Sequence, residues 1–234
     1  MIDRILIGGV IVAIGIALLY PSVVPHRTTL VSVFYDITDS QKAKPVLEDI
    51  EPFYGLEKNQ NSGAMFRYAN VTDVSLNATK VKTLPDINPW TSNEFERTKS
   101  ISDFFAFIKE SLSVIEDNGK NRSSVYLPIA RELTVISNDK ADEKNFIVYS
   151  DLMENTPEVS FYDPKTFQEL ISSPETFIER FNKLSNLPDL TGIHIFLIYQ
   201  PSNTKADEEY RTVSSFYKKL LETKGATVHI QANL

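Results

Sequence analysis

Short apolar runs alternate along the chain with segments in which apolar residues recur every three or four positions. The runs predict buried β-strands, and the periodic segments predict amphipathic helices. The predicted strands cover residues 30–35, 64–71, 78–84, 146–151, 192–199 and 226–230. The predicted helices cover residues 42–54, 95–115, 125–136, 167–184 and 208–221.

The order of these elements predicts the fold class. Strands that alternate with helices form a mainly parallel sheet with helices on both faces. The turn between segments 64–71 and 78–84 is too short for a crossover, so these two strands are antiparallel neighbours. We therefore expect a doubly wound α/β fold with a six-stranded, mainly parallel sheet and one antiparallel edge strand. The apolar stripe that begins at Phe95 is expected to face the core.

Residues 5–25 contain no charged side chain and consist mostly of aliphatic residues and glycine. As a helix this segment spans about 30 Å, which matches the hydrocarbon core of a bilayer. Pro21 and Pro25 suit the end of such a helix. We expect residues 1–27 to be an uncleaved single-pass transmembrane anchor with a short linker, and residues 28–234 to form the folded domain. A cleaved signal peptide is the alternative. The charged residues on the two sides of this segment nearly balance, so they give little indication of its orientation. We expect the domain on the outer side of the membrane, periplasmic or extracellular.

Composition narrows the possible functions. The 234 residues, 42% of them hydrophobic, suffice for one domain with a sizeable core. The formal net charge is −7, and the 24 lysine and arginine residues are scattered, so nucleic acid is not an expected partner. The absence of cysteine excludes disulfides, thiolate metal sites and a cysteine nucleophile.

The candidate chemistry lies where the first predicted strand ends. Asp36, Thr38 and Ser40 supply one carboxylate and two hydroxyl oxygens at alternate positions. Hard divalent cations take oxygen ligands of this kind. The competing interpretation is that Asp36 and Ser40 only cap the helix that follows.

Asp36-x-Thr38-x-Ser40 resembles the Asp-x-Ser-x-Ser motif that opens the metal-ion-dependent adhesion site (MIDAS) of von Willebrand factor type A (vWA) domains. The order of the predicted elements is also similar to that of vWA domains. The family's second loop carries a hydroxyl before a helix, which Ser123 matches best, with Ser124 as the alternate. Its third loop carries an aspartate at a strand end, which Asp151 matches, although Leu152 stands where the family commonly has glycine.

The resemblance implies a divalent cation, Mg²⁺ rather than Ca²⁺ or Mn²⁺. Thr38 and Ser40 would bind it directly, Asp36 and Asp151 directly or through water, and Ser123 upon ligand engagement. Because only two carboxylates serve the ion, it could accept an acidic side chain from a partner protein or peptide. Two further acids near the third loop, Glu154 and Glu158, are interpreted as ordinary surface charges.

We therefore expect a membrane-anchored protein-binding domain rather than an enzyme. One alternative is a metal-assisted hydrolase of phosphoesters, for which the sequence offers no evident base or nucleophile. Another is a structural subunit with a degenerate metal site. The histidines His26, His194 and His229 are far apart in the sequence and suggest no ligand pairing, and His194 is predicted to be a core or strand-end residue.

Overall fold

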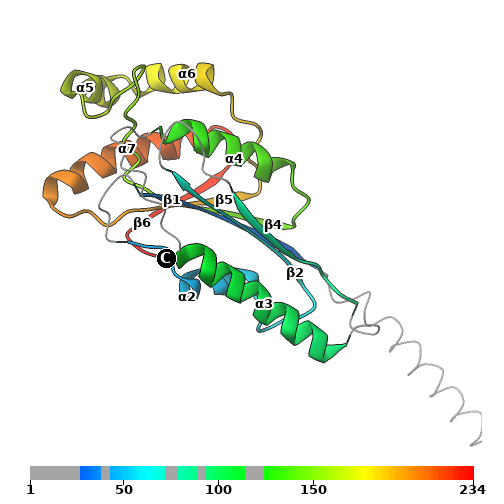
Figure 1. The fold of residues 1–234 in the computed structure, drawn as a ribbon. Helices are drawn as coiled ribbons and strands as arrows, with labels where there is room; N and C mark the ends of the chain where they lie inside the picture. Colours follow the sequence, from blue (N-terminus) through cyan, green and yellow to red (C-terminus); the bar gives the residue numbers. More distant parts are fainter. Residues whose placement is uncertain (1–26, 38–42, 72–78, 89–92, 114–123) are drawn as a thin grey trace, which may run out of the picture.

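The computed structural model describes residues 27–37, 43–71, 79–88, 93–113 and 124–234. The sheet has six strands in the order β3-β2-β1-β4-β5-β6, an order found in doubly wound folds. The β2–β3 pair is antiparallel, and all other neighbours are parallel, which confirms the predicted sheet (Figure 1). The strands are β1 Thr28–Asp36, β2 Gly63–Val71, β3 Lys80–Leu84, β4 Glu143–Tyr149, β5 Ile193–Ile198 and β6 Thr227–Gln231.

Helices cover both faces of the sheet, as predicted (Figure 1). On one face lie α2 (Leu47–Ile50), which continues into the 3₁₀ helix η1 (Glu51–Tyr54), and α3 (Glu94–Ser113). On the other face lie α4 (Tyr126–Asn138) and α7 (Thr204–Glu222), with α5 (Pro164–Ser172) and α6 (Pro174–Leu184) beyond them.

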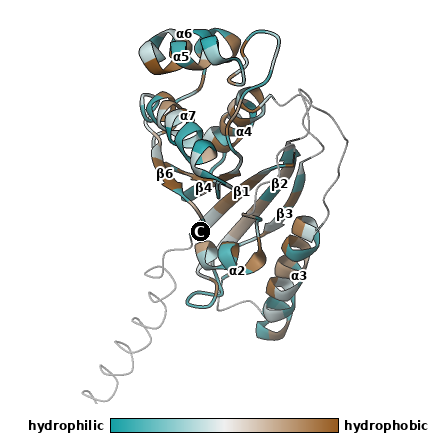
Figure 2. Ribbon diagram, turned by 90° about the vertical axis from the view of Figure 1, so that its left-hand side faces the viewer, coloured by the Kyte–Doolittle hydropathy of each residue, from teal (hydrophilic) through white to brown (hydrophobic). Residues whose placement is uncertain are grey.

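The central strand β1 is buried on both sides, as expected for a parallel strand covered by two helical layers. Leu30 and Phe34 belong to the apolar core under α4 and α7. Val31, Val33 and Tyr35 belong to the second core, under α2 and α3. Figure 2 shows much of the central sheet in the brown of hydrophobic residues.

The predicted helix 167–184 is wrong as a single element. Two helices, α5 and α6, meet at Ser173, which has φ −146° and ψ 61°. Pro174 supplies no backbone N–H, and the residue before a proline avoids the helical region, so the helix is interrupted there.

Two further expectations need correction. The helix predicted from residue 42 begins only at Leu47, because Lys44 precedes a proline and Val46 is extended, with φ −126° and ψ 157°. Its predicted end is confirmed by Gly55, which takes the left-handed conformation at φ 58°. The side chain of Phe95 is 77% exposed, since it lies in the first turn of α3, whereas Phe104 and Ile108 face the core.

Within the described ranges no helix is long and apolar enough to cross a membrane. The predicted anchor at residues 5–25 lies outside these ranges.

Candidate functional site

Two of the three predicted loops meet at the carboxyl ends of β1 and β4. These strands are parallel neighbours, with Tyr35 opposite Tyr149, so the residues that follow lie side by side. Asp36 ends β1 and is 2% exposed. The Ser150 hydroxyl donates a hydrogen bond of 2.8 Å to Asp36 Oδ2. This contact places the first-loop carboxylate beside the residue that immediately precedes Asp151.

The third loop turns sharply after β4. Ser150 Oγ accepts a hydrogen bond from the backbone N–H of Leu152 (2.9 Å), and Asp151 Oδ1 accepts one from the N–H of Met153 (2.9 Å). Leu152 has φ 62°, the left-handed conformation that glycine adopts most easily. Leucine therefore occupies a left-handed turn at this position.

Glu154 connects the third loop to the start of α4. Its Oε2 accepts hydrogen bonds of 2.9 Å from the backbone N–H groups of both Val125 and Tyr126. A carboxylate is favourable at this position because a helix N-terminus carries unsatisfied N–H groups and a partial positive charge. The contact places Val125 and Tyr126, at the start of α4, next to the third loop.

Glu154 is 4% exposed, so its interpretation as a surface charge was wrong. Burial raises the pKa of its carboxyl group, and the nearby charge of Asp36 raises the same pKa further. The backbone N–H groups of Tyr126 and Val125 and the Ser124 hydroxyl act in the opposite direction on that pKa. Ser124 Oγ is buried near this carboxylate without a hydrogen bond of ordinary geometry.

A buried hydroxyl on α7 lies in the field of the same acids. Burial raises the pKa of Tyr217 well above its ordinary value, and the charges of Glu154, Asp151 and Asp36 raise that pKa further. Among the described residues, the Tyr217 hydroxyl has no hydrogen-bond partner. The Ser150–Asp36 hydrogen bond and the short loop from Asp151 to Glu154 place the three carboxylates at the same edge of the sheet.

Of the five predicted metal ligands, the structure describes Asp36 and Asp151. Thr38, Ser40 and Ser123 lie outside the described residues. In the described part of the chain, no group of three or more histidine, cysteine, aspartate or glutamate side chains is placed to hold a metal ion. The predicted donor set differs from such a group, because it combines two carboxylates with three hydroxyls. Oxygen donors of this chemistry suit Mg²⁺.

Sequence reasoning missed three residues at this edge. Ser150 could have been found, because it ends an apolar run and precedes the predicted ligand Asp151. The buried role of Glu154 had no local signal. Tyr162, whose hydroxyl lies 3.4 Å from Asp151 Oδ2, is too far along the chain for spacing to indicate the contact.

Of the two alternatives predicted for His194, the structure shows the strand end: it is the second residue of β5, and its side chain is exposed, on the face opposite to that of Ile193 and Ile195. Its ring stacks with that of His229, at a centroid distance of 6.0 Å, and His229 stacks on Phe196 at 4.8 Å.

Comparison with known proteins found no matching family model and no matching curated protein. Among solved structures, the crystal structure of the SpRpn10 VWA domain is 8% identical, with 89% of each chain covered and a TM-score of 0.34. An aerotolerance-related membrane protein from Bacteroides fragilis, carrying multiple mutations to serines, is 9% identical. The match covers 89% of this chain and 91% of that one, with a TM-score of 0.35. At these TM-scores neither likeness carries weight, and the fold and site stand on the sheet order and the contacts described above.

Proposed function

We propose that this chain is a membrane-anchored, vWA-like domain that binds a divalent cation and through it recognises another protein or peptide. The observation that carries the proposal is the hydrogen bond between Ser150 and Asp36. It brings Asp36, at the start of the first predicted loop, next to the third loop, at the sheet edge where ligands of open α/β folds bind. The Glu154 contacts with the start of α4 support the same convergence for the second loop.

The proposed ion is Mg²⁺, which prefers oxygen donors and keeps water in its remaining positions. In this proposal Thr38 and Ser40 bind the ion directly, and Asp36 and Asp151 bind it directly or through water. Glu154 is assigned a structural role instead, because its Oε2 accepts both backbone hydrogen bonds at the start of α4. Because only two carboxylates are assigned to the ion, water fills its remaining positions, and an acidic side chain from a partner can replace a water and complete the site together with Ser123.

The proposed location is the membrane surface. The first strand begins at Thr28, immediately after the predicted anchor and linker. A domain joined to a bilayer by so few residues stays close to it, which suits capture of a membrane-bound or surface-associated partner. The outer side remains the expected location.

Calorimetric titration of the full chain in detergent with Mg²⁺ tests the metal site. We expect one binding event in the native protein and its loss in the Asp36→Asn/Asp151→Asn double variant, whose side chains keep their size but lose both charges. Circular dichroism checks that the variant is folded.

The matched control is Glu94→Gln/Glu96→Gln, which removes the same number of charges from exposed positions on α3. This variant should bind Mg²⁺ like the native protein. Equal binding by the Asp36/Asp151 variant would overturn the proposal. Absence of Mg²⁺ binding by the native chain would favour a passive structural subunit.

A further inference from the structure

Tyr162 is a large aromatic side chain displayed beside the candidate site. It is 58% exposed, and its hydroxyl lies 3.4 Å from Oδ2 of Asp151. More than half of the residue is therefore exposed, next to one of the predicted ligands of the ion.

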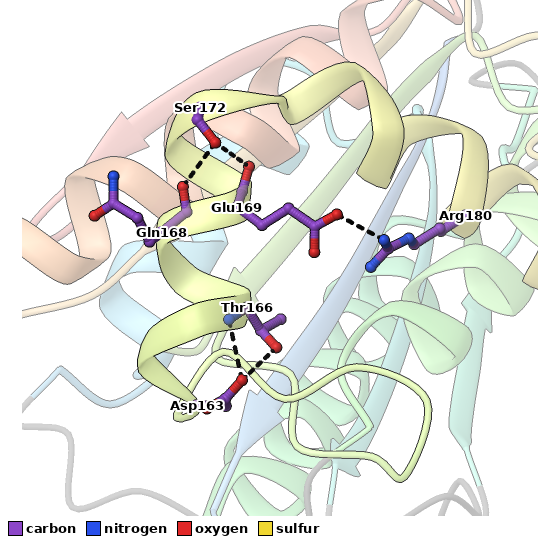
Figure 3. Close-up of polar contacts among 6 residues, drawn as sticks. All are labelled: Asp163, Thr166, Gln168, Glu169, Ser172 and Arg180. Carbon is purple, nitrogen blue, oxygen red and sulfur yellow. Dashed lines mark hydrogen bonds and ion pairs between the residues drawn. The ribbon is translucent and has the colours of Figure 1, made fainter.

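The backbone on both sides of Tyr162 is firmly held. The N–H of Phe161 donates to the Glu154 carbonyl (2.9 Å), and the Phe161 ring is buried against Phe177, Phe181 and Phe216 at centroid distances of 5.9, 6.2 and 6.2 Å. On the other side, the Asp163 carboxylate caps α5 by accepting hydrogen bonds from the N–H (3.0 Å) and hydroxyl (2.8 Å) of Thr166 (Figure 3).

The loop before Tyr162 is itself closed. Asn155 and Ser160 form an antiparallel bridge, and the Ser160 hydroxyl donates to Asn155 Oδ1 at 3.1 Å. An aromatic ring on a backbone fixed in this way can contact a partner with little additional loss of conformational entropy. Tyrosines of this kind are enriched among the residues that dominate binding energy at protein interfaces.

The charges around the Tyr162 ring determine which kind of partner can bind beside it. Asp151 lies beside the ring, and Glu158 and Asp163 are exposed on the same loop. Without a cation this surface repels an acidic partner. With the proposed ion bound, the carboxylate of a partner can approach while the ring offers apolar contact at the side.

We propose that Tyr162 is a specificity-determining contact for the partner, and this inference rests on the proposed function. Alternate side chains of an extended peptide lie on the same face about 7 Å apart. A peptide whose acidic side chain coordinates the ion therefore presents the side chain two positions away on the same face as that acid. For contact with the Tyr162 ring, the preferred partner segment carries an aspartate or glutamate with an aromatic or large aliphatic residue two positions away.

Fluorescence anisotropy with short labelled peptides tests this inference on the full chain in detergent with Mg²⁺. The probes are capped glycine–serine peptides with a central glutamate and either tryptophan or alanine two positions from it. We expect the native chain to bind the tryptophan probe about fivefold more tightly, the size of effect typical of an aromatic pair. In Tyr162→Ala this preference should fall below about twofold, and in Tyr162→Phe it should persist.

Two controls separate this inference from the proposed function. Phe95→Ala removes another exposed aromatic ring, on α3, and should leave the probe preference unchanged. Calorimetry with Mg²⁺ alone should give the same affinity for Tyr162→Ala as for the native chain.

The possible failures are distinguishable. If the native chain binds no probe in a Mg²⁺-dependent manner, the proposed function is overturned. If the probes bind but Tyr162→Ala keeps the preference for tryptophan, only the role of Tyr162 is overturned. An equal loss of Mg²⁺ and probe affinity in Tyr162→Ala would also overturn it, because Tyr162 would then act by orienting Asp151.

Discussion

Leu152 combines a buried apolar side chain with a left-handed backbone conformation. Its side chain is fully buried in the core under α4 and α7, while its backbone has φ 62°. A left-handed conformation costs a residue with a Cβ atom roughly 1–2 kcal/mol. The buried leucine side chain offsets this cost, so apolar burial stabilises a turn that glycine would adopt more easily.

This balance predicts an unusual order of stabilities at position 152. Leu152→Ala loses the buried side chain and keeps the backbone strain, whereas Leu152→Gly loses the side chain and relieves the strain. We expect both variants to be destabilised by about 2–5 kcal/mol, with glycine about 1 kcal/mol more stable than alanine. Urea denaturation measures the difference.

Leu133 provides the control, because it is equally buried but lies within α4. There glycine should be about 1 kcal/mol less stable than alanine, the usual helix preference. The same order at both positions would show that strain at residue 152 is unimportant.

At the scale of elements, one buried carboxylate attaches α4 to the sheet. Glu132 accepts two hydrogen bonds from the Arg67 guanidinium on β2, at 2.5 and 3.0 Å, and one from the Ser32 hydroxyl on β1, at 2.8 Å. Both Glu132 and Ser32 are buried. Because α4 begins at the candidate site, this contact helps to fix the position of the second loop relative to β1.

Removal of one partner from this cluster should be strongly destabilising. Glu132→Ala leaves the Arg67 cation without its carboxylate, and we expect a loss of about 3–5 kcal/mol in the free energy of unfolding. The triple variant Ser32→Ala/Arg67→Leu/Glu132→Leu should recover most of this loss, because no buried polar group is then unpaired.

The exposed pair Arg180–Glu169, at 2.7 Å between α6 and α5, is the matched control (Figure 3). Glu169→Ala should change the free energy of unfolding by less than about 1 kcal/mol. A similar small effect for Glu132→Ala would contradict the structural role assigned to the buried cluster.

The whole molecule is organised around the sheet. Every strand of that sheet lies between Thr28 and Gln231, inside the predicted domain 28–234. One apolar core lies on each face of the sheet. We therefore predict that residues 28–234 fold cooperatively without the segment before them.

A fragment of residues 28–234 should consequently unfold in one cooperative thermal transition, as measured by circular dichroism. It should also remain in the supernatant when expressing cells are fractionated, whereas the full chain sediments with membranes. Membrane association by the fragment would contradict the predicted anchor, and loss of the cooperative transition would contradict the predicted domain boundary.

The sequence by itself determined the element types and their order. All six strands and their directions follow from apolar runs and connection lengths, because these are local properties of the chain. The acids Asp36 and Asp151 could be assigned to strand ends for the same reason. Helix breaks were harder to predict. At Ser173–Pro174 the helical spacing of apolar residues continues across the break, although the proline cannot donate the backbone hydrogen bond that a continuous helix needs.

Only the tertiary structure decided which side chains meet. Burial of Glu154 against the start of α4, the Ser150–Asp36 hydrogen bond and the approach of Tyr162 to Asp151 join residues from different elements. Such contacts depend on strand register and on the direction of each side chain after packing. Local periodicity contains neither of these, so it can locate the edge of the sheet but not the partners that assemble there.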